Sequence, residues 1–214
     1  MITKYEQFME SFNLLEKDKC INMVFKWLIE EEISIETLYE DILVTALSNL
    51  SDVETDPNHR IWFEHVQSSI IRTIIEMAHP FVLKQKGSKS LGLKGAVICP
   101  DGEQHELGAR MINDYLTKHG ITSYFVGRDT PKSEFNDMIV SLDLDVVAIS
   151  VTNYYNLSEV RKTIELIRAQ TKDVKIILGG RAIIQNPQLY EQYENTIIFT
   201  NSQQLLNWLQ GGAK

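Results

Sequence analysis

The residues of this sequence with the clearest capacity for chemistry lie in PDGEQHELGARM, residues 100–111, directly after the apolar run GAVIC. A loop that only reverses the chain needs Gly, Pro and Asp, whereas this one also carries Glu103, His105 and Gly108 at spacings of two and three. A carboxylate two residues before a histidine can bind one ring nitrogen, which fixes the tautomer and raises the basicity of the other nitrogen. This spacing is typical of an oriented histidine that binds a metal.

His105 also has simpler explanations when it is taken alone. It can be a solvated loop histidine, or it can cap the helix that follows, and a single H-x-x-G spacing does not separate these explanations from metal binding. Gly108 removes a side chain near the expected start of that helix, where a wide ligand would have to approach.

Polar side chains also follow the apolar run VVAI. Ser150 and Thr152 stand at its end, and Asn156 with Glu159 three residues later has the spacing of a capping box for the next helix. Ser150 and Thr152 are therefore surplus as caps, and their hydroxyls suit hydrogen bonding to a ligand.

A third loop begins with Gly179 and Gly180 after the apolar run KIIL. Two glycines fit a turn that needs a positive φ angle. They equally fit a backbone that passes close to a bulky ligand, and both explanations can hold together.

From Lys94 onward, short apolar runs alternate with amphipathic stretches, as in an α/β fold. The predicted strands are residues 95–99, 121–126, 145–151, 174–180 and 195–199, and the predicted helical segments are residues 111–119, 131–142, 157–170, 187–193 and 203–209. Runs such as VVAIS lack alternation, as expected for parallel strands that are covered on both faces. We therefore expect an open, doubly wound, five-stranded parallel sheet, in which the three polar loops converge at the carboxyl ends of the strands.

The first part of the chain, to about residue 86, has helical spacing throughout, which predicts a helical bundle. Helices are expected over residues 19–32 and 34–50 and from about residue 58 to about residue 82. An acidic stretch with an Asp-Pro pair, residues 51–59, is expected to link the last two. The basic, glycine-containing stretch 84–94 separates the two patterns, so we expect domains at residues 1–88 and 89–214.

Composition limits the class of function. The chain has 214 residues, of which 43% are hydrophobic and 23% charged, as in ordinary globular proteins, and its formal charge is −8. This charge opposes binding to phosphate backbones and anionic lipids, so direct nucleic-acid and membrane binding are not expected. Cys20 and Cys99 lack short-spaced partners, and the sequence shows neither a signal-peptide core nor an apolar stretch of membrane-spanning length. We expect a cytoplasmic protein.

The three loops together resemble the cobalamin-binding domain, through E-x-H-x-x-G after the first strand, S-x-T after the third and G-G after the fourth. The more usual form begins with Asp, and Glu103 is similar to the variant in adenosylcobalamin light-sensing regulators of the MerR class. The resemblance covers about residues 10–210. It implies a four-helix cap followed by a flavodoxin-like (Rossmann-like) sheet.

The resemblance also implies how a corrinoid would bind. His105 would ligate cobalt from below with the nucleotide base of the corrinoid displaced, and Glu103 would orient His105. Ser150 and Thr152 would line the slot for the nucleotide tail, and the pair Gly179 and Gly180 would let the base of the tail pass close to the backbone. Adenosylcobalamin is favoured as the cofactor, and methylcobalamin also fits.

The cap residues of the light-sensing group follow the pattern W-x9-E-H. Here Glu64 and His65 supply the E-H pair, but the position ten residues before Glu64 is Glu54 rather than Trp. The aromatic side chain that would shield the upper ligand is therefore missing from its expected place.

The resulting primary hypothesis is a cobalamin-binding regulator or photoreceptor that signals through movement of the cap to a partner protein, such as a transcription regulator. The alternative is a corrinoid protein that carries methyl groups in a methyltransferase system. A third possibility is an interaction module that has lost cobalamin. Independent enzyme activity is not expected, because no nucleophile and base come with an orienting group and oxyanion donors. The sequence is also compatible with a homo-oligomer.

Overall fold

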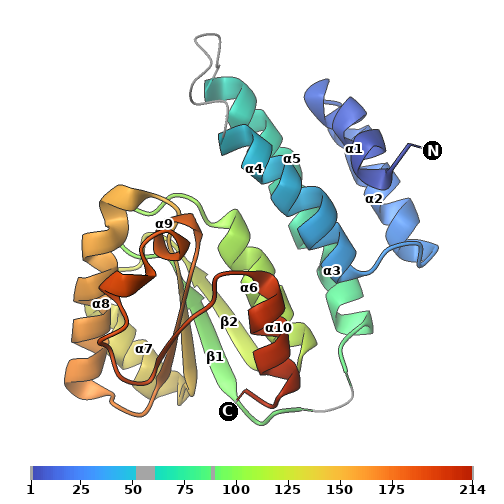
Figure 1. The fold of residues 1–214 in the computed structure, drawn as a ribbon. Helices are drawn as coiled ribbons and strands as arrows, with labels where there is room; N and C mark the ends of the chain where they lie inside the picture. The colour runs from blue at the N-terminus through green and yellow to red at the C-terminus, as the bar shows by residue number, and fades with distance from the viewer. Residues whose placement is uncertain (1, 52–60, 88–89, 214) are drawn as a thin grey trace. The chain divides into compact units, whose positions relative to one another are not determined.

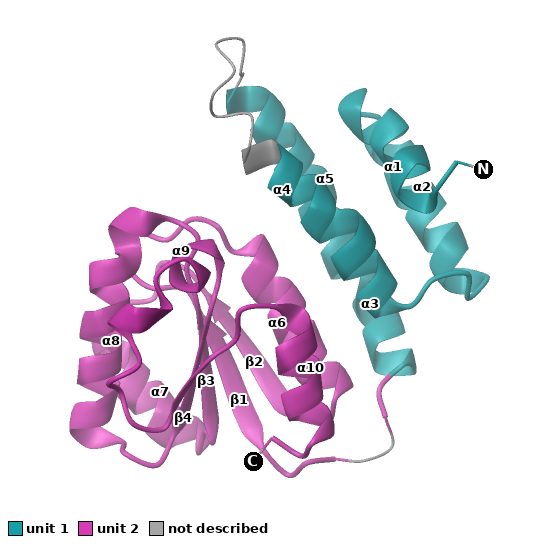
Figure 2. Cartoon of the chain, in the orientation of Figure 1, with its two compact units in different colours: residues 1–85 teal, residues 86–214 magenta. Residues whose placement is uncertain are grey.

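A computed structural model describes residues 2–51, 61–87 and 90–213 of the chain. The chain forms two compact units, Met1–Gln85 and Lys86–Lys214, so the division falls inside the basic stretch 84–94 (Figure 2). Within the described residues, no helix is long and apolar enough to cross a membrane.

The first unit consists of helices. Its elements are α1 (Lys4–Asn13), α2 (Lys17–Ile29), α3 (Ile35–Thr37), the π-helix η1 (Leu38–Val44), α4 (Thr45–Ser51) and α5 (Ile61–Lys84). The elements α3, η1 and α4 follow one another without a break, and they cover the helix expected over residues 34–50. Residues 52–60, which hold most of the expected acidic linker, the expected start of the third helix and Glu54, lie outside the described residues.

Helix α1 was not among the helices expected from apolar spacing. Thr3 and Glu6 form a complete capping box at its start, and Phe8 and Phe12 stack with ring centroids 5.1 Å apart. Both rings are fully buried, so these two residues anchor α1 in the core of the first unit. The local signal was the T-x-x-E spacing followed by two aromatic residues four positions apart.

The second unit is a parallel α/β sheet, which confirms the expected fold class. Its strands are β1 (Lys94–Ile98), β2 (Thr122–Gly127), β3 (Val146–Ser150), β4 (Lys175–Gly179) and β5 (Thr196–Ile198). All neighbouring strands pair in parallel, in the order β2-β1-β3-β4-β5. This order is that of flavodoxin-like sheets, and its direction reverses between β1 and β3.

Helices lie on both faces of this sheet (Figure 1). The longer ones are α6 (Leu107–Lys118), α7 (Phe135–Leu142), α8 (Leu157–Gln170) and α10 (Ser202–Gln210), and the shorter ones are η3 (Lys132–Glu134), η4 (Tyr154–Asn156), α9 (Arg181–Ile184) and η5 (Pro187–Leu189). Figure 1 shows α7 and α8 on one face, and α6 and α10 on the other. The apolar residues of the central strands β1, β3 and β4 are buried, as the lack of alternation predicted, whereas those of the edge strands β2 and β5 are partly exposed.

Helix α6 begins four residues earlier than the predicted start at residue 111. Leu107 and Ala109 are both buried, so the first turn already packs on the sheet although Gly108 interrupts the apolar pattern. The helix therefore starts immediately after the E-x-H stretch, and the carboxyl end of β1 and the start of α6 together fix the ends of this loop.

Candidate corrinoid site

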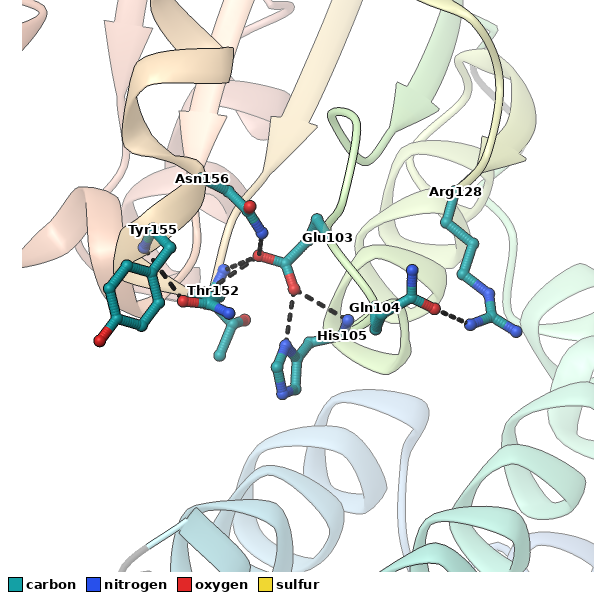
Figure 3. Close-up of polar contacts among 8 residues, drawn as sticks. Glu103, Gln104, His105, Arg128, Thr152, Tyr155 and Asn156 are labelled. Carbon is teal, nitrogen blue, oxygen red and sulfur yellow. Dashed lines mark hydrogen bonds and ion pairs between the residues drawn. The ribbon is translucent and has the colours of Figure 1, made fainter.

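Glu103 lies in the loop between β1 and α6, and its side chain is completely buried. One carboxylate oxygen, Oε1, accepts a hydrogen bond from the backbone N–H of His105 at 2.9 Å and lies 2.6 Å from His105 Nδ1. The other, Oε2, accepts from the backbone N–H groups of Thr152 at 3.0 Å and Asn153 at 2.9 Å, and from Nδ2 of Asn156 at 3.3 Å (Figure 3). One carboxylate thus joins the loop after β1 to the loop after β3.

These contacts keep the carboxylate ionised. Burial by itself would raise the pKa of Glu103, but the hydrogen bonds from the side chain of His105, the backbone of Asn153 and His105, and the side chain of Asn156 outweigh it and lower the pKa to about 2. An ionised carboxylate can only accept hydrogen bonds, so Nδ1 of His105 carries a proton in this contact. That tautomer makes Nε2 the basic nitrogen of the ring.

The His105 ring is positioned by Glu103 but is accessible to a ligand. Its side chain is 55% exposed, whereas that of Glu103 is 0% exposed. Figure 3 shows the ring projecting from the loop, with Nε2 on the side of the ring away from Glu103. The contact between Glu103 and His105 that their spacing indicated is therefore present, and it presents a nitrogen of defined tautomer at the surface of the second unit.

Asn156 has a different role from the one expected. The sequence suggested a capping box of Asn156 and Glu159 for α8, but the Asn156 side chain makes no capping hydrogen bond. Its amide instead donates to Glu103, while Asn153 caps the preceding turn through its Oδ1 and the N–H of Tyr155. Sequence reasoning missed Asn156 as a site residue because capping spacing gave a sufficient local explanation for it.

Ser150 and Thr152 stand at the carboxyl end of β3 as expected. Thr152 contacts Glu103 through its backbone N–H, not through its hydroxyl. Neither hydroxyl has a hydrogen-bond partner among the residues that the structure describes, and both side chains are only partly buried. The two hydroxyls can therefore bind a ligand without breaking an internal contact.

The three candidate glycines differ in what the fold requires of them. A Cβ on Gly180, which has φ +96°, would lie 2.3 Å from the carbonyl oxygen of Val151, so the fold itself needs this glycine. A Cβ on Gly108 or Gly179 would meet nothing within 4 Å, and neither residue has a positive φ. The fold of the chain therefore gives no reason for a glycine at position 108 or 179.

Glu64 lies in the first turn of α5, and His65 follows it. Glu64 is partly buried and His65 is exposed, within the first compact unit. Their part in corrinoid binding stays a prediction.

The chain belongs to the B12-binding domain family, because the family model described as the B12 binding domain matches residues 93–201, half of the chain. Among curated proteins, dimethylamine corrinoid protein 3 of Methanosarcina acetivorans is 28% identical over 87 residues, which cover 40% of this chain and 41% of that protein. The HTH-type transcriptional repressor CarA of Myxococcus xanthus is 24% identical over 117 residues, covering 55% of this chain and 39% of the repressor. The chain thus spans about two-fifths of the length of these relatives. They are named as a corrinoid protein and a repressor, not as independent enzymes.

Solved structures support the same fold over nearly the whole chain. The monomethylamine corrinoid protein of Methanosarcina barkeri superposes with a TM-score of 0.81 at 10% identity, covering 95% of each chain. A cobalamin-binding protein from Desulfitobacterium hafniense DCB-2 has a TM-score of 0.51 at 15% identity, covering 99% of each chain. At these identities the likeness shows the arrangement of elements only, and it extends through the N-terminal helices.

Proposed function

We propose that the second unit binds cobalamin with its nucleotide base displaced and with Nε2 of His105 as the lower ligand of cobalt. The observation that carries this proposal is the pair of Glu103 and His105, in which a fully buried carboxylate fixes the tautomer of a half-exposed imidazole. A carboxylate behind a ligating histidine orients the ring and raises the basicity of the ligating nitrogen.

The side chains at this site fit a metal ion that is already held in a macrocycle when it binds. Among residues 2–51, 61–87 and 90–213 there is no group of three or more His, Cys, Asp or Glu that could hold a metal ion. A site built on one imidazole cannot fill the coordination sphere of a protein-bound metal, but it can supply one axial ligand to cobalt in a corrin ring. When bound, the corrinoid would supply a cobalt–carbon bond on the opposite, upper side.

Other residues would hold the remaining parts of the corrinoid. Gly108 leaves open space beside the start of α6, and Gly179 does the same at the end of β4. Ser150 pairs with Gly179 across β3 and β4. The hydroxyls of Ser150 and Thr152 would donate to or accept from the nucleotide tail. Gly180 would contribute through the backbone path that its positive φ permits.

We further propose that the corrinoid serves a regulator or photoreceptor. Loss of an upper adenosyl group by light would alter the affinity of the helical unit for the loaded second unit, because a ligand shifts a conformational equilibrium only by its differential affinity for the two states. Support comes from Glu64 and His65 at the start of α5, from Glu103 in place of Asp, and from the alignment with a transcriptional repressor over 117 residues. The output would go to a partner protein such as a transcription regulator.

A carrier of methyl groups is the second candidate. The relatives include several dimethylamine corrinoid proteins, which match the chain over 87 residues. Glu54 in place of an aromatic residue removes the expected shield for a bulky adenosyl group and leaves methylcobalamin as a suitable cofactor. In this case the partner would be a methyltransferase subunit.

Absorption spectra of the protein mixed with adenosylcobalamin or methylcobalamin test the common proposal. We expect a base-displaced, histidine-ligated spectrum with the wild-type chain, and a water-ligated spectrum with affinity lower by about 10- to 100-fold for His105→Ala. His79→Ala, which changes a histidine of α5 that has no part in the proposed site, is the control for the lower ligand and should keep the histidine-ligated spectrum. Identical spectra for wild type and His105→Ala would exclude ligation by this residue.

Green light separates the two finer functions. For a photoreceptor, illumination of the adenosylcobalamin complex should change its hydrodynamic size or its binding to a protein partner. For a methyl carrier, illumination should leave size unchanged, and the methylcobalamin complex should transfer its methyl group to a thiol or amine acceptor in the presence of a methyltransferase subunit.

A further inference from the structure

A guanidinium outside the three candidate loops contacts the residues on both sides of His105. Arg128 is the first residue after β2, and its Nη1 donates to the side-chain oxygen of Gln104. Its Nε lies 3.8 Å from Oε2 of Glu106. One side chain therefore binds the residue before His105 and the residue after it (Figure 3 shows the bond to Gln104).

Glu106 is an unusual partner for a surface arginine because its side chain is only 5% exposed. Its Oε1 accepts from Nη2 of Arg110 at 3.2 Å, and the Arg110 guanidinium stands 4.5 Å from the centre of the Phe125 ring. A buried carboxylate needs such partners because burial without them is costly. Arg110 supplies one such partner and Arg128 a second, and Nε of Arg128 also lies 3.6 Å from Oδ2 of Asp129.

The end of β2 is shaped to let Arg128 reach this position. The register of β1 and β2 shifts after Val97, so that Ile98 pairs with Gly127 rather than with the residue before it. Gly127 has φ +72°, and a Cβ on it would lie 2.9 Å from the Phe125 ring and 3.3 Å from Oε2 of Glu106. The backbone thus passes directly beside the buried carboxylate, and the next side chain in the chain is that of Arg128.

We propose that Arg128 and Glu106 are positioning residues for His105, in addition to Glu103. This inference rests on the proposed role of His105 as the cobalt ligand. Glu103 attaches the loop to β3 on one side, and Arg128 attaches the same loop to the end of β2 on the other side. The loop that presents the imidazole is then ordered before the corrinoid arrives, which lowers the entropy cost of binding.

The variants are chosen to separate positioning from general stability. Arg128→Met removes both contacts and keeps the length of the side chain, Arg128→Lys keeps the charge without the planar fork, and Gln104→Ala removes one contact at an exposed position. Lys132→Met is the matched control. Lys132 bridges Asp101 at 3.3 Å and Glu159 at 2.5 Å, so it joins the same loop to α8 but does not contact a neighbour of His105.

The first measurement uses the protein without corrinoid. Amide hydrogen exchange over residues 101–107, followed by mass spectrometry, should be about tenfold faster in Arg128→Met than in wild type, while exchange in β3 and β4 stays unchanged. Lys132→Met should exchange like wild type over residues 103–107. Equal exchange in Arg128→Met and wild type would overturn the proposal, whatever happens with corrinoid.

The second measurement uses the cobalamin complex. Arg128→Met should weaken binding by about tenfold, the lower end of the range for residues behind a metal ligand, and Gln104→Ala by less. The cobalt(II) form should show a smaller fraction of nitrogen-coupled signal in electron paramagnetic resonance, and Arg128→Lys should restore part of it. If Arg128→Met kept the wild-type affinity and signal, or if Lys132→Met reduced both equally, Arg128 would have no positioning role.

Failure of the underlying ligand proposal has a different signature. If the wild-type complex itself lacked a nitrogen-coupled signal, His105 would not be the cobalt ligand, while altered exchange in Arg128→Met would still show that Arg128 orders the loop. If Arg128→Met did not fold, Gln104→Ala would decide, because Gln104 is exposed and its loss leaves Glu106 paired with Arg110. Wild-type exchange and affinity in Gln104→Ala would then overturn the proposal.

Discussion

Replacing Glu103 by Gln tests the central contact of the site in the protein without corrinoid. The Glu103 carboxylate accepts all five of its hydrogen bonds and donates none, and three of the five donors are backbone N–H groups. A glutamine has one oxygen and one NH2 group, so one end of its amide would face donors only. We therefore expect Glu103→Gln to be strongly destabilised at neutral pH even though it has the same shape.

The expected size follows from the pKa. Glu103 has a pKa of about 2 in the fold against an ordinary value of 4.5. Because the folded pKa is the lower one, the ionised carboxylate stabilises the fold above pH 4.5, and this stabilisation is lost as pH falls toward 2. At about 1.4 kcal/mol per pKa unit it amounts to about 3 kcal/mol at pH 6 and about 1 kcal/mol at pH 3.

Urea unfolding followed by circular dichroism from pH 6 to pH 3 measures this difference. Wild type should lose about 2 kcal/mol more of its free energy of unfolding than Glu103→Gln over this range. Glu191→Gln, which changes an exposed carboxylate of the same unit, should lose as much as wild type. If the stability of wild type and of Glu103→Gln changed equally with pH, the five donors would not stabilise the Glu103 carboxylate, and Glu103 would not fix the tautomer of His105.

Three further predictions concern the glycines and the thiols. Gly108→Ala should raise the stability of the corrinoid-free protein by about 0.5 to 1 kcal/mol, as measured by thermal unfolding. The same variant should weaken cobalamin binding in a spectral titration. Unchanged binding would mean that no ligand approaches this position. Gly180→Ala should unfold or strongly destabilise the chain, because its methyl group would meet a backbone oxygen at 2.3 Å. Gly179→Ala should keep the stability of the wild type and lose affinity for cobalamin. Equal melting temperatures for the two variants would contradict this distinction. Burial raises the pKa of Cys20 to about 11 and of Cys99 to about 12, so both thiols should resist a disulfide reagent at pH 8 until urea unfolds the protein, and rapid labelling of the native chain would contradict their burial.

The sequence by itself determined the α/β fold and the place of the candidate site in it. Apolar runs without alternation predicted buried parallel strands, because such strands are covered on both faces. Glu103 lies four residues after one of these runs, and Ser150 and Gly179 stand at the ends of two others, so the topology of a parallel sheet was enough to gather them at one edge. The spacing of Glu103 and His105 also predicted their contact, because it is local.

Only the tertiary structure decided which groups complete the site. Oε2 of Glu103 is bound by groups 49 to 53 positions away in the chain, and no local pattern distinguishes Asn156 as one of these partners from Asn156 as a helix cap. The side chain of Arg128 reaches Gln104, 24 positions earlier, through a register shift that spacing does not reveal. Sequence patterns record the preferences of neighbouring residues, whereas a buried carboxylate is stabilised by whichever donors the folded backbone brings within about 3 Å, and that distance exists only after the strands have paired.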